Sequence, residues 1–131
     1  MTPTSINYHA KSRVLEVGFE DGKQFSMSAE YLRVYSPSAE VRGHGLAEPK
    51  LVPDKQEVVI ASIDPIGNYA VRLRFDDGHD TGLYTWELLY DLGLNFAANW
   101  DTYQRRLSEA GHQPGGSSSP STALNVTKYS P

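Results

Sequence analysis

Two similar Asp-Gly turns constrain the fold of this chain more than any other feature of its sequence. The first follows Phe19 in Phe-Glu-Asp-Gly, and the second follows Phe75 in Phe-Asp-Asp-Gly. The residues before each turn alternate between apolar and polar side chains, which is typical of a half-buried strand. Because an Asp-Gly pair tolerates the positive φ angles of tight hairpin turns, we predict two β-hairpins. Their strands cover residues 14–20, 23–27, 69–75 and 83–84.

A short helix is predicted after each hairpin. Ser28 and Thr85 carry hydroxyl groups that can cap a helix N-terminus, and a glutamate follows in each first turn. We place these helices at residues 29–35 and 86–92. Gly93 follows the second helix, and we expect it to adopt the left-handed conformation of a C-cap there.

The two units resemble each other beyond their turns. Residues 28–32 match residues 85–89 at an offset one residue larger than that of the hairpins, and a bulge at Gly82 would account for the difference. Asp-Gly hairpins are common, so coincidence is the alternative. Either interpretation predicts an α+β fold: a small antiparallel β-sheet built from two Asp-Gly hairpin units, with short helices packed on one face.

The remaining segments complete a single domain with a tail. We predict a long loop over residues 36–56 and a buried strand over residues 57–63. A C-terminal helix is predicted over residues 96–110, because four apolar residues recur on one stripe: Phe96, Trp100, Tyr103 and Leu107. We expect the domain to span residues 1–111, and residues 112–131, rich in Gly, Ser and Pro, to form a disordered tail.

Composition excludes several classes of function. The chain has 131 residues, a formal net charge of −4 and no cysteine. A net acidic domain lacks the basic footprint of a nucleic-acid-binding protein. The absence of cysteine excludes disulfides, thiolate nucleophiles and cysteine-ligated metals. No secretory signal or membrane-length apolar run is present, so we expect a cytoplasmic protein that does not bind membranes.

Acidic residues gather at the second turn, where Asp76, Asp77 and Asp80 lie close in sequence. Carboxylates could hold a hard cation, but a calcium loop needs its oxygen ligands in a fixed register. Asp-Asp-Gly-His-Asp lacks that register. We therefore interpret these residues as turn formers.

Histidines and arginines are the other candidates for a site. His44 lies between two glycines and His79 lies at the second hairpin tip, where either could be a ligand or a general base. Exposed loop histidines usually do neither. A basic surface is also possible, since two arginines share the outward face of one predicted strand. The arginines considered are Arg33, Arg42, Arg72 and Arg74.

Three segments resemble the γ-butyrobetaine hydroxylase-like N-terminal domain family, long catalogued as a domain of unknown function. They are Leu-Arg-Val-Tyr-Ser-Pro-Ser-Ala-Glu-Val over residues 32–41, Phe-Asp-Asp-Gly-His over residues 75–79 and Tyr-Thr-Trp-Glu-Leu-Leu over residues 84–89. The resemblance covers roughly residues 8–95. Such domains occur alone in bacteria, in front of γ-butyrobetaine and trimethyllysine dioxygenases, and attached to iron–sulfur carrier proteins in plants.

The resemblance also implies a metal site that this chain has lost. In the dioxygenases the domain binds structural zinc through three cysteines and a histidine. The corresponding positions here are Ser36, Ser38, Val41 and His79. One histidine cannot replace four nitrogen or sulfur donors, so we expect no metal and no cofactor. Apolar packing would then hold the fold together, through Phe19, Phe75, Trp86 and Trp100.

Catalysis is not expected. No histidine begins the His-x-Asp/Glu motif of an iron/2-oxoglutarate site, and no nucleophile-base pair is evident in the sequence. The favoured hypothesis is a non-catalytic accessory or protein-interaction domain, with a protein partner or a second copy. The resemblance implies a link to iron–sulfur protein or metabolic enzyme assembly. The alternative is a small-molecule or metal-binding domain that uses His44, His79 and nearby acids.

Overall fold

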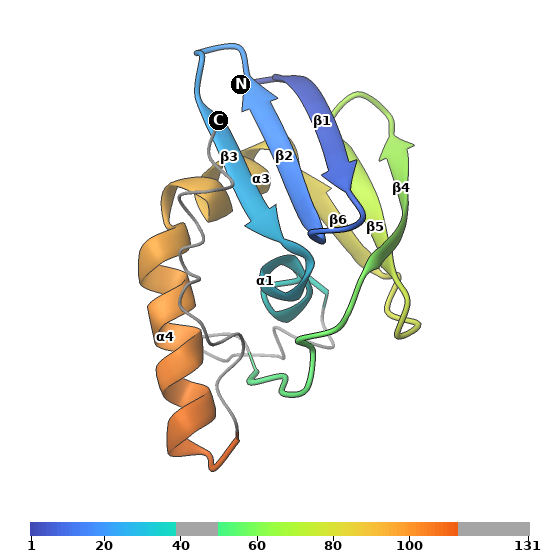
Figure 1. The fold of residues 1–131 in the computed structure, drawn as a ribbon. Coiled ribbons are helices and arrows are strands. Elements are labelled where there is room, and N and C mark those ends of the chain that lie inside the picture. The colour runs from blue at the N-terminus through green and yellow to red at the C-terminus, as the bar shows by residue number, and fades with distance from the viewer. Residues whose placement is uncertain (39–49, 113–131) are drawn as a thin grey trace.

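The computed structural model describes residues 1–38 and 50–112, which form two three-stranded antiparallel sheets and three helices. Each sheet is a meander with its strands in chain order, followed directly by a helix (Figure 1). The first unit comprises β1 (Pro3–His9), β2 (Val14–Phe19), β3 (Gln24–Ser28) and α1 (Ala29–Val34). The second comprises β4 (Ile60–Ile66), β5 (Ala70–Phe75), β6 (Gly82–Thr85) and α3 (Trp86–Leu94), and α4 (Phe96–Glu109) follows.

The two predicted hairpins are present, and their turns have the same hydrogen bonds. The N–H of Gly22 donates to the carbonyl of Phe19 at 2.9 Å, and the N–H of Gly78 donates to that of Phe75 at 3.1 Å. Both glycines have positive φ angles, 90° and 93°. The α+β fold expected from the repeated turn is therefore confirmed.

Each unit contains one strand beyond its hairpin. β1 pairs with β2 and was not predicted, because only Ile6 and Tyr8 supply apolar side chains on its inward face. β4 pairs with β5 and begins three residues later than predicted, at Ile60. It runs through Pro65, which an edge strand tolerates because one side of its backbone needs no hydrogen bond.

Two glycines have roles that differ from those predicted. Gly93 is not a left-handed C-cap but lies inside α3, where a side chain would overlap the ring of Phe25 on β3. Gly82 is not a bulge, because it pairs in continuous register with Leu73. A Cβ atom at Gly82 would lie 2.5 Å from the Ser36 hydroxyl oxygen. Close packing, rather than backbone conformation, therefore requires glycine at both positions.

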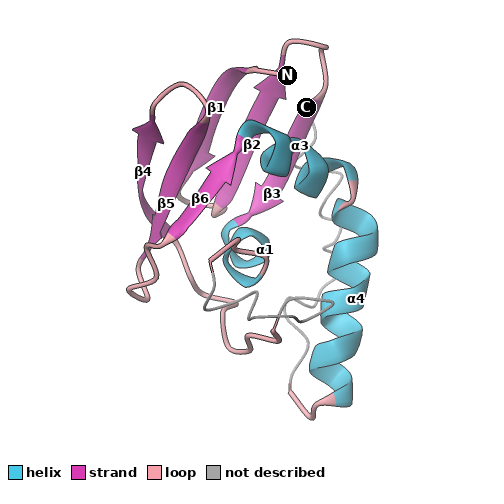
Figure 2. Ribbon diagram, turned by 180° about the vertical axis from the view of Figure 1, so that it is seen from behind, coloured by secondary structure: helices cyan, strands magenta, loops and turns pink. Residues whose placement is uncertain are grey.

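A single apolar core joins the two sheets and the helices. Phe19 and Phe75 are both 3% exposed, whereas Trp86 and Trp100 are only partly buried against the core. Seen from behind, α1 lies beneath the ends of the strands, and α4 runs along one side of the molecule (Figure 2). Within the described ranges, no helix has the length and apolar character needed to cross a membrane.

Candidate functional site

A cluster of charged side chains lies where the second hairpin meets α1. The carboxylate of Asp77 accepts hydrogen bonds from Arg33 Nε at 2.8 Å and from Lys55 Nζ at 2.6 Å. Burial raises the pKa of the Asp77 carboxyl, but hydrogen bonds from Lys55, a backbone N–H and Arg33 outweigh it, so the pKa lies well below its usual range. The cluster joins the turn, α1 and the segment before β4 into one unit.

His79 lies beside this cluster and is buried, contrary to its predicted place at an exposed hairpin tip. It is only 5% exposed, and its Nε2 lies 2.9 Å from the hydroxyl oxygen of Ser36, which is fully buried. Ser38 forms a second hydroxyl contact, with Thr81 at 2.8 Å. The hairpin therefore packs its polar side chains against the residues that follow α1.

Three of the four positions that correspond to the family's zinc ligands are close together. Ser36 and His79 are in contact, and Ser38 donates its backbone N–H to the Ser36 hydroxyl at 3.2 Å. Val41 lies outside the described residues. Two hydroxyls and one imidazole do not fit structural zinc, which requires four nitrogen or sulfur donors. In the described parts of the chain, no three His, Cys, Asp or Glu residues are grouped to hold a metal ion.

The acidic residues of the second turn point to different partners. Asp76 accepts the N–H of Val59 at 3.0 Å, and Asp77 is bound to its two cations. Asp80 lies 4.0 Å from Arg74 on the outer face of the sheet. This arrangement agrees with their interpretation as turn residues rather than as ligands of one cation.

Arg72 and Arg74 share the outward face of β5, as predicted. Both contact Asp64 on β4, at 3.6 Å and 2.8 Å respectively. A hydrogen bond from Arg74 lowers the pKa of the Asp64 carboxyl. Leu83 on β6 is paired with Arg72 and is 40% exposed, so an apolar side chain lies beside the two guanidinium groups.

The structure brings only some of the candidate residues together. Arg33 and His79 lie at one cluster, while Arg72 and Arg74 lie on the outer sheet face. Two candidates, Arg42 and His44, lie outside the described residues. The same is true of the predicted tail, of which only His112 is described. Sequence reasoning missed Lys55, because no local pattern links a loop lysine to an aspartate in a later turn.

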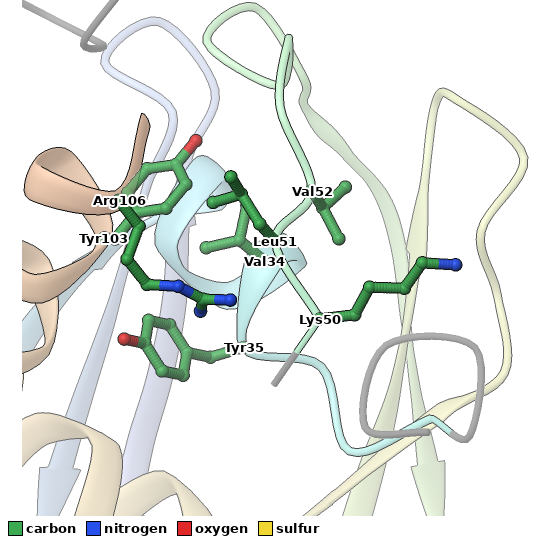
Figure 3. Close-up of a pocket in the computed structure, with 7 residues that line it drawn as sticks. All are labelled: Val34, Tyr35, Lys50, Leu51, Val52, Tyr103 and Arg106. Atoms are coloured by element: carbon green, nitrogen blue, oxygen red, sulfur yellow. The ribbon is translucent and has the colours of Figure 1, made fainter. Parts of the chain in front are cut away.

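Two hollows in the described parts of the surface illustrate the space near the candidate residues. One has a volume of about 10 Å³, room for roughly one water molecule, and lies between the end of α1, residues 50–52 and α4 (Figure 3). The other is an open groove of about 350 Å³ between the start of β1 and the side chain of Trp86. Neither hollow contains the buried polar cluster.

Comparisons with known proteins place these features in a family context. Residues 6–90 match the family described as gamma-butyrobetaine hydroxylase-like, N-terminal. Two solution NMR structures are similar. The first is 50% identical, with a TM-score of 0.76, and the alignment covers 91% of this chain and 90% of that chain. The second is 40% identical, with a TM-score of 0.75, and the alignment covers 90% of this chain and 93% of that chain.

A crystal structure from Acidithiobacillus ferrooxidans is similar as well. It is described as a protein with unknown function of the DUF971 family, and it is 38% identical with a TM-score of 0.60. The alignment covers 70% of this chain and 92% of that one. The comparison with curated proteins found no match.

Proposed function

The chain belongs to the gamma-butyrobetaine hydroxylase-like N-terminal family, and from this premise we propose that it is a non-catalytic accessory domain that binds another protein. The proposal rests on the observation that two polar candidate residues, Arg33 and His79, already form contacts with other residues of the domain. Arg33 is bound to Asp77, and His79 to Ser36. Groups held in this way stabilise the domain and are poorly placed to meet a substrate.

The outer face of β5 and β6 is the proposed binding surface, which we define by Arg72, Arg74 and Leu83. Arginine and apolar side chains are enriched at the centres of protein interfaces. The side chains of Arg72 and Arg74 are 37% and 46% exposed, so their guanidinium groups can reach a carboxylate on a partner. The partner would present a carboxylate and an apolar side chain. The family resemblance favours a partner in iron–sulfur protein or metabolic enzyme assembly.

Co-purification from the native host, followed by cross-linking and mass measurement, tests this function. We expect a defined complex, or a dimer, that is lost in the double variant Arg72→Ala, Leu83→Ser. Arg105→Ala is the matched control, because its side chain is 56% exposed on α4, away from the proposed surface. A strict monomer without a partner that instead binds a metabolite tightly would contradict the proposal.

Metal analysis of the purified chain tests the competing hypothesis of a metal site at His79. We expect less than stoichiometric metal, because His79 is buried against a serine and Asp77 is already paired with two cations. Stoichiometric zinc that disappears in His79→Ala would overturn the interpretation of a lost site. His44 would be tested in the same assay, as His44→Ala.

A further inference from the structure

The outer face of β4, β5 and β6 carries charges of both signs. Asp64 is the register partner of Arg72, and Arg72 is the register partner of Leu83, so these three side chains project from the same face. Arg74 lies further along β5, and Asp80 of the second hairpin approaches it at 4.0 Å. The named side chains are thus two cations, two anions and one exposed leucine.

The four charged side chains differ in how firmly the chain itself binds them. Asp64 accepts a hydrogen bond from Arg74 Nε at 2.8 Å. The ion pair of Arg72 with the same carboxylate is longer, at 3.6 Å, and the ion pair of Asp80 is longer still. The side chains of Arg72 and Asp80 are 37% and 52% exposed. These two residues are therefore the cation and the anion most free to bind a group on another molecule.

A second copy of this chain has the chemistry that the surface requires of a partner. The proposed partner presents a carboxylate and an apolar side chain, and this face presents Asp80 and the 40% exposed Leu83. In a dimer with two-fold symmetry, the same surface lies on both sides of the contact, and each pair of residues occurs twice. A face with an available cation and an available anion is complementary to itself under that symmetry.

We propose that the partner of this face is a second copy of the chain, in a symmetric dimer where Arg72 of each copy binds Asp80 of the other. Leu83 lies beside Arg72 on the sheet and becomes covered in the same contact. This inference rests on the proposed function, because it names the partner of the surface defined by Arg72, Arg74 and Leu83.

The size of the face indicates a weak dimer. Three strands about 4.8 Å apart, with at most seven residues that each rise about 3.4 Å, give a flat area on the order of 300 Å². Stable complexes bury about 800 Å² on each partner. The formal net charge of −4 adds repulsion between copies. We therefore expect a dimer that forms at high protein concentration and exchanges with the monomer.

Sedimentation equilibrium of the full wild-type chain, at concentrations up to about 1 mM, provides the first test. We expect a reversible monomer–dimer equilibrium. Arg72→Glu and Asp80→Arg each place two pairs of like charges across the contact, so each should weaken association at least about tenfold. Arg105→Ala on α4 is the matched control and should associate like the wild type.

A mixture of the two charge-reversed variants provides the second test. When Arg72→Glu meets Asp80→Arg, opposite charges face each other at both pairs, so an equimolar mixture should form a heterodimer about as strongly as the wild type forms its dimer. One variant carries a fluorescent label, and circular dichroism confirms that both are folded. Folded variants that do not associate in the mixture would overturn the proposed pairing.

The same measurements separate this inference from the proposed function. A wild-type chain that is monomeric up to about 1 mM, yet co-purifies with another protein through Arg72 and Leu83, would overturn the dimer and leave the proposed function standing. A dimer that survives both charge reversals would show that the copies meet through a different face, which also overturns the inference. A monomer without any partner would contradict both.

Discussion

The two strand-strand-strand-helix units have the same order of elements. Equivalent positions in their turns and helices form the contacts between the units. Asp21 of the first turn accepts the hydroxyl of Tyr90 on α3 at 2.5 Å. Asp77 of the second turn accepts Arg33 on α1 at 2.8 Å. The capping hydroxyls also correspond, since Ser28 and Thr85 each accept a backbone N–H at 3.1 Å. Each turn therefore reaches across to the helix of the other unit.

The units differ in what covers their helices. Five of the six residues of α1 are buried, whereas only Leu89 and Leu92 are buried in α3. The first-turn glutamates show the contrast most directly: Glu30 is 8% exposed beneath α4, and Glu87 is exposed. The repeat thus builds the scaffold. The asymmetry around α1 is accompanied by the buried contact of His79 with Ser36 and by the buried hydrogen bond from Tyr103 on α4 to Glu30.

The largest difference in stability between the two units is expected when the turn aspartates Asp21 and Asp77 are each replaced by alanine. Asp77→Ala removes the partner of Arg33, whose side chain is only 11% exposed, and should lower the free energy of unfolding by about 3 kcal/mol. Asp21→Ala should lose much less, because its partner Tyr90 can bond to water. Urea unfolding of both variants measures the difference. Equal losses would show that the second cluster is no more stabilising than the first.

A second difference lies in the longer helix of the second unit, whose last turn crosses β3 at Gly93. Alanine normally favours a helix over glycine by about 1 kcal/mol. Gly93→Ala should nevertheless destabilise the protein by about 2 kcal/mol, because the new methyl group overlaps the ring of Phe25. The double variant Gly93→Ala, Phe25→Leu should recover part of the loss. A more stable single variant would refute the close packing of α3 on β3.

The turns themselves should respond alike. Gly22→Ala and Gly78→Ala each place a side chain at a φ near +90°, with no atom within 4 Å to clash. Each should therefore cost about 1 kcal/mol from backbone conformation alone. Thermal unfolding of the two variants should show equal shifts. Unequal shifts would mean that the turns are under different strain and that the repeat is less regular than its hydrogen bonds indicate.

Local patterns in the sequence were sufficient to predict both hairpins and the caps at Ser28 and Thr85. These features depend on residues close in sequence, such as Asp-Gly pairs and alternating apolar residues. β1 was missed because its polar side chains line an outer face and its pairing with β2 is set by the rest of the sheet. Gly93 was misassigned because its requirement comes from Phe25, which is distant in sequence.

The site was harder to predict than the fold for the same reason. His79 was placed at an exposed tip because a turn residue usually faces solvent. In the structure, the turn folds onto the residues after α1 and buries His79 against Ser36. Lys55 and Thr81 join the cluster from segments without any motif. Such contacts depend on how the two units pack, which no local spacing records.

The smallest effect is expected in how the free energy of unfolding depends on pH, which should differ between the buried Glu30 and the exposed Glu87. Burial raises the pKa of Glu30 above its ordinary 4.5, and a hydrogen bond from Tyr103, the charge of Glu57 and the charge of Arg13 modify it. Since the raised pKa favours the protonated form in the folded state, the stability it contributes is present below pH 4.5 and lost as the pH rises through the folded-state pKa.

Glu30→Gln removes this titration and keeps an acceptor for Tyr103. The free energy of unfolding of the variant relative to wild type should therefore increase from about pH 4.5 upward and level off once Glu30 is ionised in the fold. Glu87→Gln is the matched control, and it should have little effect because its side chain is exposed. Urea unfolding at a series of pH values that begins below 4.5 and extends to neutral pH tests this. A constant difference would mean that α4 does not bury an ionisable Glu30, and the two helices would then be equivalent.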